Sequence, residues 1–100
     1  MWSKISDNKL YVVSSRRDSD FFTGVEGIYV NIDSCVESVI EILREGYAAR
    51  EEEEEIDFPE DKLRKEITNK FDHYTSYWND FLDITFDVTP SCVWKYEKWD

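Results

Sequence analysis

The segment from Leu82 to Val88 constrains the fold more than any other part of the sequence. Its apolar and polar residues alternate strictly, in the order Leu82, Asp83, Ile84, Thr85, Phe86, Asp87, Val88. Because successive side chains of a strand point to opposite faces, this pattern predicts a strand with one buried face and one acidic, solvated face. A strand of this kind belongs to an antiparallel sheet that other elements cover on one side.

Three further segments favour strands. Residues 9–15 (KLYVVSS) and 27–33 (GIYVNID) are rich in β-branched and aromatic side chains, and the polar, glycine-containing stretch between them suits a hairpin loop. Residues 92–99 (CVWKYEKW) follow a predicted turn at 89–91 (TPS). We therefore expect 92–99 to pair with 82–88 as a second hairpin.

The middle of the chain predicts two helices. The first begins at Ser34, which forms an S-x-x-E capping box with Glu37. Its apolar residues recur at helical spacing as Val36, Val39, Ile40 and Leu43. Gly46 weakens the helix near its end, so we expect it to stop there or to fray through Arg50.

The second helix has an Asp57-x-x-Glu60 start, with Pro59 in its first turn. Its apolar stripe runs through Leu63, Ile67, Phe71, Tyr74 and Trp78. The element order is then ββααββ. We expect residues 1–100 to form one small single α+β domain, an antiparallel sheet with two helices packed on one face.

The composition is strongly acidic. The chain has 23 Asp and Glu against 12 Lys and Arg, a net charge of −11, yet 41% of its residues are apolar and 16% aromatic, as in a folded domain. Residues 51–100 carry 15 acidic and 6 basic groups, so −9 of the charge lies in that half. Such a charge disfavours direct binding to nucleic acid or anionic membrane and favours a basic protein partner.

Signatures of catalysis and of metal binding are missing from the sequence. His73 is the only histidine, and its neighbour Asp72 points to a different side of the helix. Cys35 and Cys92 begin apolar segments, so we interpret them as reduced core thiols, and no acidic segment has the spacing of a calcium loop. We expect no enzymatic activity, no cofactor, no metal site and, without an apolar run of 18 residues, a cytoplasmic protein.

The acidic residues themselves are the candidate binding surface. Eight carboxylates fall within residues 51–61, a density that approximates the phosphates of DNA, which recur about every 3.4 Å along each strand. C-terminal aromatic residues within an acidic surround resemble the anchors of protein interfaces. The predicted partner-binding residues are Glu51, Glu52, Glu53, Glu54, Glu55, Asp57, Glu60, Asp61, Asp80, Asp83, Asp87, Trp94, Tyr96 and Trp99.

These features favour a small acidic inhibitor that blocks the basic nucleic-acid-binding surface of another protein, a nuclease or a nucleic-acid-binding complex. In size and charge the chain resembles the DNA-mimicking anti-CRISPR and anti-restriction proteins, which implies a phage or mobile-element protein that acts against host defence. Two alternatives stay open: an immunity protein or antitoxin that neutralises a nuclease toxin, and a non-catalytic adaptor or structural subunit. For the five-glutamate run, a solvated connection between the helices is the alternative interpretation.

Overall fold

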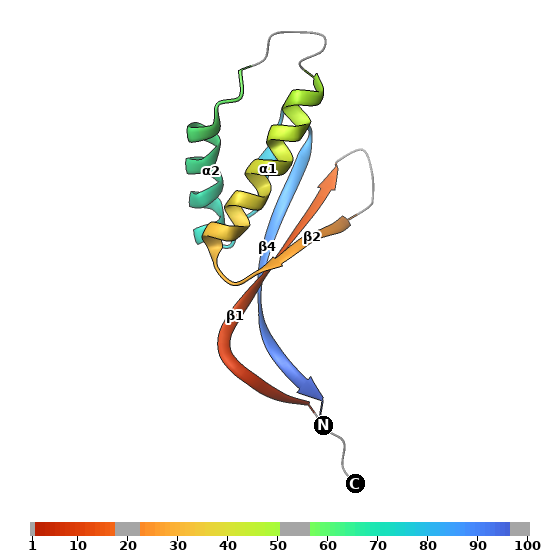
Figure 1. Cartoon of the computed structure of the whole chain (residues 1–100), viewed down its shortest axis with the longest axis vertical. Coiled ribbons are helices and arrows are strands. Elements are labelled where there is room, and N and C mark those ends of the chain that lie inside the picture. Colours follow the sequence, from red (N-terminus) through yellow and green to blue (C-terminus); the bar gives the residue numbers. More distant parts are fainter. Residues whose placement is uncertain (1, 18–22, 51–56, 97–100) are drawn as a thin grey trace.

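The computed structural model describes residues 2–17, 23–50 and 57–96. The elements along the chain are β1 (Trp2–Arg17), β2 (Thr23–Tyr29), α1 (Ile32–Arg50), α2 (Glu60–Asp72), β3 (Tyr77–Asn79) and β4 (Ile84–Tyr96). The strands form one antiparallel sheet in the order β2-β1-β4-β3, and the two helices lie against it (Figure 1). The predicted small α+β domain of order ββααββ is confirmed.

Both helices pack on the same face of the sheet. The sheet contributes Val13 of β1 and Phe86 of β4 to the core on this face. Both are fully buried against the apolar sides of α1 and α2. The helical residues of the core are Cys35, Val36, Val39, Ile40, Leu43, Tyr47, Leu63, Ile67 and Phe71. The predicted inward side of 82–88 is confirmed, because Leu82, Ile84, Phe86 and Val88 are all buried.

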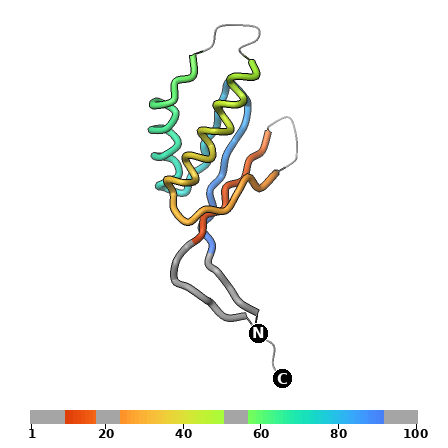
Figure 2. Tube along the Cα trace, viewed as in Figure 1, coloured from red at the N-terminus to blue at the C-terminus, as the bar shows by residue number. Residues whose placement is uncertain are grey.

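The predicted hairpin at 89–91 is wrong. Residues 84–96 form one continuous strand, β4, in which Thr89, Pro90 and Ser91 pair with β1 rather than turn. The first and last strands of the chain thus lie side by side (Figures 1 and 2). Because β3 pairs only with Ile84–Phe86, β4 has a strand on one side only at Pro90, and a residue without an N–H is tolerated at such an open edge.

The predicted second helix is too long. It ends at Asp72, where the N–H of Tyr74 donates to the Phe71 carbonyl at 3.0 Å and that of Thr75 to the Lys70 carbonyl at 2.9 Å. This is a Schellman motif, with Tyr74 in the left-handed conformation at φ 54°. Trp78, which continues the apolar helical spacing, lies instead on β3 between the buried residues Tyr77 and Asn79.

Other element boundaries also differ from the prediction. β1 begins at Trp2 instead of residue 9, and β2 ends at Tyr29, so the predicted strand 27–33 runs into α1. The cap of α1 is Asn31, whose Oδ1 accepts the N–H of Ser34 at 2.8 Å, and Ser34 is a helical residue. The residue preceding α2 is Pro59, with no side-chain cap. Gly46 lies inside α1. Leu82 packs where the Cβ of another residue would stand, so a larger residue would clash there.

Candidate acidic interface

Four acidic residues recur along α1 at four-residue spacing: Asp33, Glu37, Glu41 and Glu45. All four are exposed, and the opposite side of the helix is buried in the core. Residues four apart lie on one side of a helix, about 6 Å apart along the axis, so the set spans about 18 Å. We call this set the α1 stripe.

Two basic residues near the α1 stripe join the helices. Arg64 of α2 forms an ion pair with Glu37, and its Nη2 lies 3.9 Å from a carboxylate oxygen of Glu60. Arg44 of α1, adjacent in sequence to Glu45, reaches Glu60 across the helix interface. The hydrogen bond to Glu37 raises the pKa of the Arg64 guanidinium. These pairs stabilise the contact between α1 and α2.

The remaining stripe residues lack such partners. Within the part of the chain that the structure describes, Asp33, Glu41 and Glu45 form no ion pair with a basic residue. Like charges at i,i+4 destabilise a helix by about 0.2–0.5 kcal/mol per pair. The fold therefore keeps an unfavourable row of carboxylates on α1, although Arg44 is three residues from Glu41.

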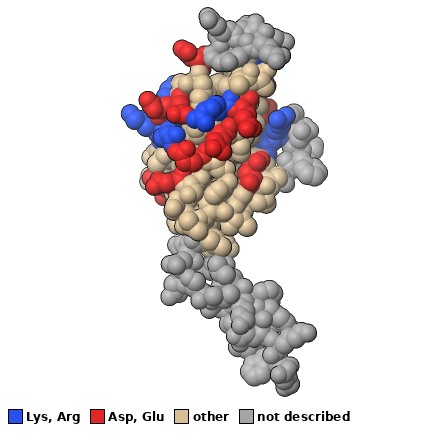
Figure 3. All heavy atoms as spheres, viewed as in Figure 1, with Lys and Arg blue, Asp and Glu red and all other residues tan. Residues whose placement is uncertain are grey.

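Acidic and basic side chains intermingle over the helix layer as a whole. Figure 3 shows both kinds of charge across the two helices, because α2 also presents exposed Lys62, Lys65 and Lys70. Exposed acids on α2, such as Asp61 and Glu66, thus have basic neighbours along the same helix. The less balanced acidic row is the one on α1.

The predicted acids nearest the start of α2 are only partly free. Glu51 to Glu55 lie outside the described residues. Asp57 and Asp61 are exposed, the first ahead of α2 and the second in its first turn. Glu60 is half-buried and holds Arg44 and Arg64, so its charge is compensated within the chain.

The predicted acids near β3 and β4 form a separate group. Asp80 is exposed, and Asp83 adopts φ 55° in the turn before β4, where it accepts a hydrogen bond of 3.4 Å from Nε1 of Trp78. Asp87 lies on the sheet face away from the helices. There it accepts a hydrogen bond from Ser76 and lies 3.8 Å from Nε of Arg16. Asp87 and the α1 stripe are consequently on opposite sides of the sheet.

Three C-terminal aromatic residues are predicted as anchors. Trp94 and Tyr96 belong to β4, but their side chains lie outside the described part of the structure, as does all of Trp99. An aromatic side chain that the structure does expose is Trp78, 57% accessible on β3. The helical spacing of the sequence predicts a helix at Trp78, and the structure places it on a strand.

The α1 stripe was missed by the sequence analysis. Its i,i+4 spacing is visible in the sequence, but Glu37 also fits a capping box with Ser34, and the run at 51–61 is denser in acidic residues. Which of the acids would be neutralised by Arg44 and Arg64 depends on how α1 and α2 pack, and this information is not local. The spacing rule alone could have identified the row.

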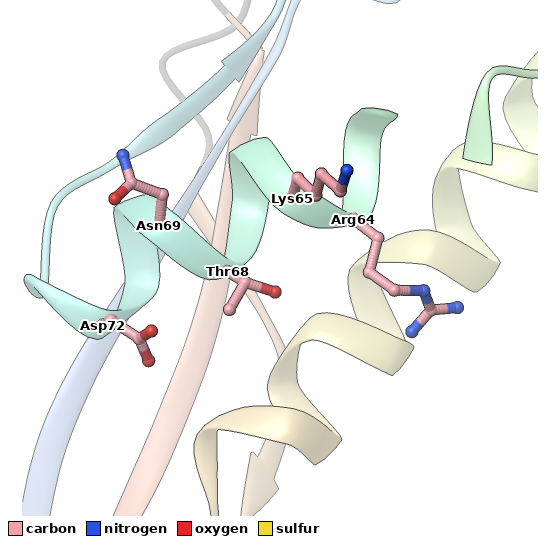
Figure 4. Close-up of a pocket in the computed structure, with 5 residues that line it drawn as sticks. All are labelled: Arg64, Lys65, Thr68, Asn69 and Asp72. Carbon is pink, nitrogen blue, oxygen red and sulfur yellow. The ribbon is translucent and has the colours of Figure 1, made fainter. Parts of the chain in front are cut away.

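A shallow hollow of about 400 Å³ lies along α2 (Figure 4). Arg64, Thr68 and Asp72 project from one side of the helix, with Arg64 extending towards α1, and Lys65 and Asn69 complete the lining. His73 lies outside this lining. Its Nδ1 donates to the Asn69 carbonyl at 2.8 Å and so helps to end α2. Among the described residues, no cluster of His, Cys, Asp and Glu could hold a metal ion.

Cys35 is a free thiol at the centre of the core, with no exposed surface. Burial raises the pKa of this thiol to about 11, which disfavours the reactive thiolate at neutral pH. The interpretation of Cys35 as a packed core thiol is confirmed. No helix among the described residues is long and apolar enough to cross a bilayer.

Comparisons with family models, with curated proteins and with solved structures found no match for this chain.

Proposed function

We propose that this chain is a small acidic inhibitor that binds and covers the basic nucleic-acid-binding surface of another protein. The observation that carries the proposal is the α1 stripe, in which Glu41 and Glu45 stay without a basic partner among the described residues. A row of repelling carboxylates costs stability in the free protein. Contact with lysine and arginine side chains would relieve that cost.

The geometry of α1 suits this role. The carboxylates of the α1 stripe recur about every 6 Å along the axis, close to the axial rise of two phosphates on one DNA strand. The helix that carries them is held from behind by Val39, Ile40 and Leu43, which are fully buried. A row fixed on a packed helix loses less conformational entropy on binding than a flexible acidic loop.

The mechanism is charge replacement. Carboxylates of the α1 stripe, extended by the acidic residues at the start of α2, take the places of phosphates against an Arg/Lys cluster on the partner. The net charge of −11 speeds the encounter with a basic surface at low ionic strength. The same charge repels nucleic acid, so the partner is a protein.

The setting we propose is the cytoplasm, where a phage or mobile-element protein would act on a nuclease or a nucleic-acid-guided complex of the host. Inhibition here is by occupation of a site, without catalysis. An immunity protein would use the same contacts on a toxin, and the identity of the partner distinguishes the two.

The test is a pull-down with the tagged full chain from host lysate, at low and at high salt, followed by mass spectrometry of the captured proteins. We expect a basic nuclease or nucleic-acid-binding protein that is released at high salt, because screening weakens exposed charge contacts. Capture of partners that are not basic, or binding indifferent to salt, would contradict the proposal. Such an outcome would favour an adaptor.

A further inference from the structure

Among the described residues, no helix or strand covers the face of the sheet that points away from the helices. Along β1 and β4 the residues between the core positions lie on this outer face: Val12 between Tyr11 and Val13, and Thr85 and Asp87 on either side of the buried Phe86. A register shift in β2 places Val25 opposite Ser14, the next outer-face residue of β1 after Val12. Trp78 of β3 is opposite Thr85, and Ile28 of β2 is opposite Val12. We call these positions the outer sheet face.

This face is apolar to an unusual degree for a chain of such charge. Val25 and Ile28 on β2 are 67% and 61% exposed, and Trp78 on the other edge of the sheet is 57% exposed. Val12 between them is half-buried. Large apolar side chains that gather on one exposed face mark an interaction surface more often than scattered ones do.

Two opposite charges in the middle of the outer sheet face compensate each other. Arg16 and Asp87 lie on neighbouring strands and approach to 3.8 Å, so their opposite charges compensate each other locally. The helix layer, in contrast, carries the α1 stripe. Two copies of a chain with net charge −11 repel each other, and they do so least when their outer sheet faces meet and their acidic helices point apart.

From these observations we infer that the outer sheet face is the interface of a homodimer, in which two copies pack sheet against sheet. Two sheets pack face to face at a separation of about 10 Å with their apolar side chains interdigitated. A twofold arrangement needs a surface that is complementary to itself. The outer sheet face meets that condition, because Arg16 of one copy can meet Asp87 of the other while the apolar residues meet their equivalents.

A basic partner is the less suitable occupant. Asp87 on this face already has Arg16 and Ser76 as partners, and Asp83 at its edge accepts the hydrogen bond of Trp78, so lysine or arginine side chains of another protein would find few free carboxylates there. A second copy of this chain can pack there without a free carboxylate. If the proposed function holds, the dimer would also present two α1 stripes on its outer sides, and two-site binding would increase avidity.

The test is sedimentation velocity of the full chain alone over a range of protein and salt concentrations. We expect a species of twice the 12.0 kDa chain mass whose population rises with salt, because salt screens the repulsion between acidic copies and leaves apolar contacts intact. This salt response is opposite to that expected for the basic partner. Failure of the dimer and failure of the inhibitor proposal are therefore distinguishable.

The variant Ile28→Lys should raise the dimer dissociation constant by about tenfold or more, because a charge enters the apolar interface. Ala48→Lys is the matched control: it lies on an exposed position of α1 and makes the same change in net charge. The control should dimerise as well as the wild type or better. Unchanged thermal midpoints would show that both variants fold, and Ile28→Thr offers a milder substitution that keeps strand propensity.

A wild type that stays monomeric at every concentration and salt would overturn the inference. So would a dimer that dissociates as salt rises, since charge pairs would then hold it together. Equal effects of Ile28→Lys and Ala48→Lys would overturn it as well, by placing the interface elsewhere.

Discussion

The side-chain amide of Asn79 donates a hydrogen bond of 3.2 Å to the hydroxyl of Tyr47, and so ties β3 to α1. The same amide nitrogen lies 3.2 Å from the hydroxyl of Tyr77, and the amide oxygen accepts the N–H of Leu82 at 2.9 Å. Asn79 is 2% exposed, so these bonds are made away from water. One buried side chain thus fixes the turn that leads into β4.

Asn79→Ala should lower the free energy of unfolding by about 2–3 kcal/mol, because it leaves the Leu82 N–H and two tyrosine hydroxyls without their partner. Urea unfolding followed by circular dichroism measures the loss. The control is Asn69→Ala, an exposed position on α2 where we expect a change within about 0.5 kcal/mol. Equal stability of the two variants would show that the buried amide contributes nothing special.

Removal of stripe charges should separate binding from folding. Glu41→Gln with Glu45→Gln is expected to weaken binding of the captured basic partner about three- to tenfold at low salt, mainly through slower association. Stability should rise by about 0.5 kcal/mol, because repulsion between like charges is relieved. Surface plasmon resonance and thermal unfolding measure the two effects.

The matched control for the stripe variant is Glu66→Gln with Asp72→Asn, which makes the same change in net charge on exposed positions of α2. If both double variants weaken binding equally, total charge matters and the α1 stripe does not. Replacement of Glu51–Glu55 by glutamine tests the other candidate. Inhibition that survives that change would make the run a solvated connection.

Arg64 should stabilise the helix pair in a salt-dependent way. Arg64→Gln removes the ion pair with Glu37 and the contact with Glu60, and we expect a small fall in the thermal midpoint at low salt. The fall should shrink in high salt, because these side chains are partly exposed. Lys62→Gln, at an exposed position without an ion pair to a described residue, is the control and should change stability little.

Alkaline pH should destabilise the protein through Cys35. Burial raises the pKa of its thiol from 9.0 to about 11, so above pH 9 the unfolded chain loses this proton before the folded protein does. The stability contribution is complete below pH 9 and is lost between pH 9 and 11. The pKa values of Tyr11 and Tyr77 are raised as well, by a hydrogen bond with Tyr74 and by burial respectively, and act in the same direction.

Denaturant titrations from pH 8 to 11 measure this decline. Cys35→Ala should reduce its slope while lowering stability at pH 8, because the substitution leaves a small cavity. In the wild type at pH 8, the Cys35 thiol should react with iodoacetamide only when the protein unfolds. An identical pH slope in the variant would show that the tyrosines account for the decline.

Local pattern by itself determined that the chain combines strands with two helices, and which side of 82–88 and of the first helix is buried. The alternation from Leu82 to Val88 and the helical spacing of Val36, Val39, Ile40 and Leu43 each require one apolar face, and both faces are buried in the structure. Periodicity predicts burial because the hydrophobic effect favours burying apolar side chains. Those that recur at the helical or strand period lie on one face and are buried together.

Tertiary structure decided where elements end and which charges stay free. Tyr74 and Trp78 continue the helical spacing of α2, but the chain leaves the helix at Tyr74, and Asn79 of the strand that follows reaches Tyr47 of α1. The sequence around Pro90 predicts a turn. In the structure Pro90 lies within β4, at a point that the short β3 does not reach, so that edge of β4 is open. Glu60 is acidic in sequence, yet Arg44 and Arg64 neutralise it across the helix pair. Each of these outcomes depends on residues distant in sequence, whose contacts form only when the chain packs, and no local pattern contains them.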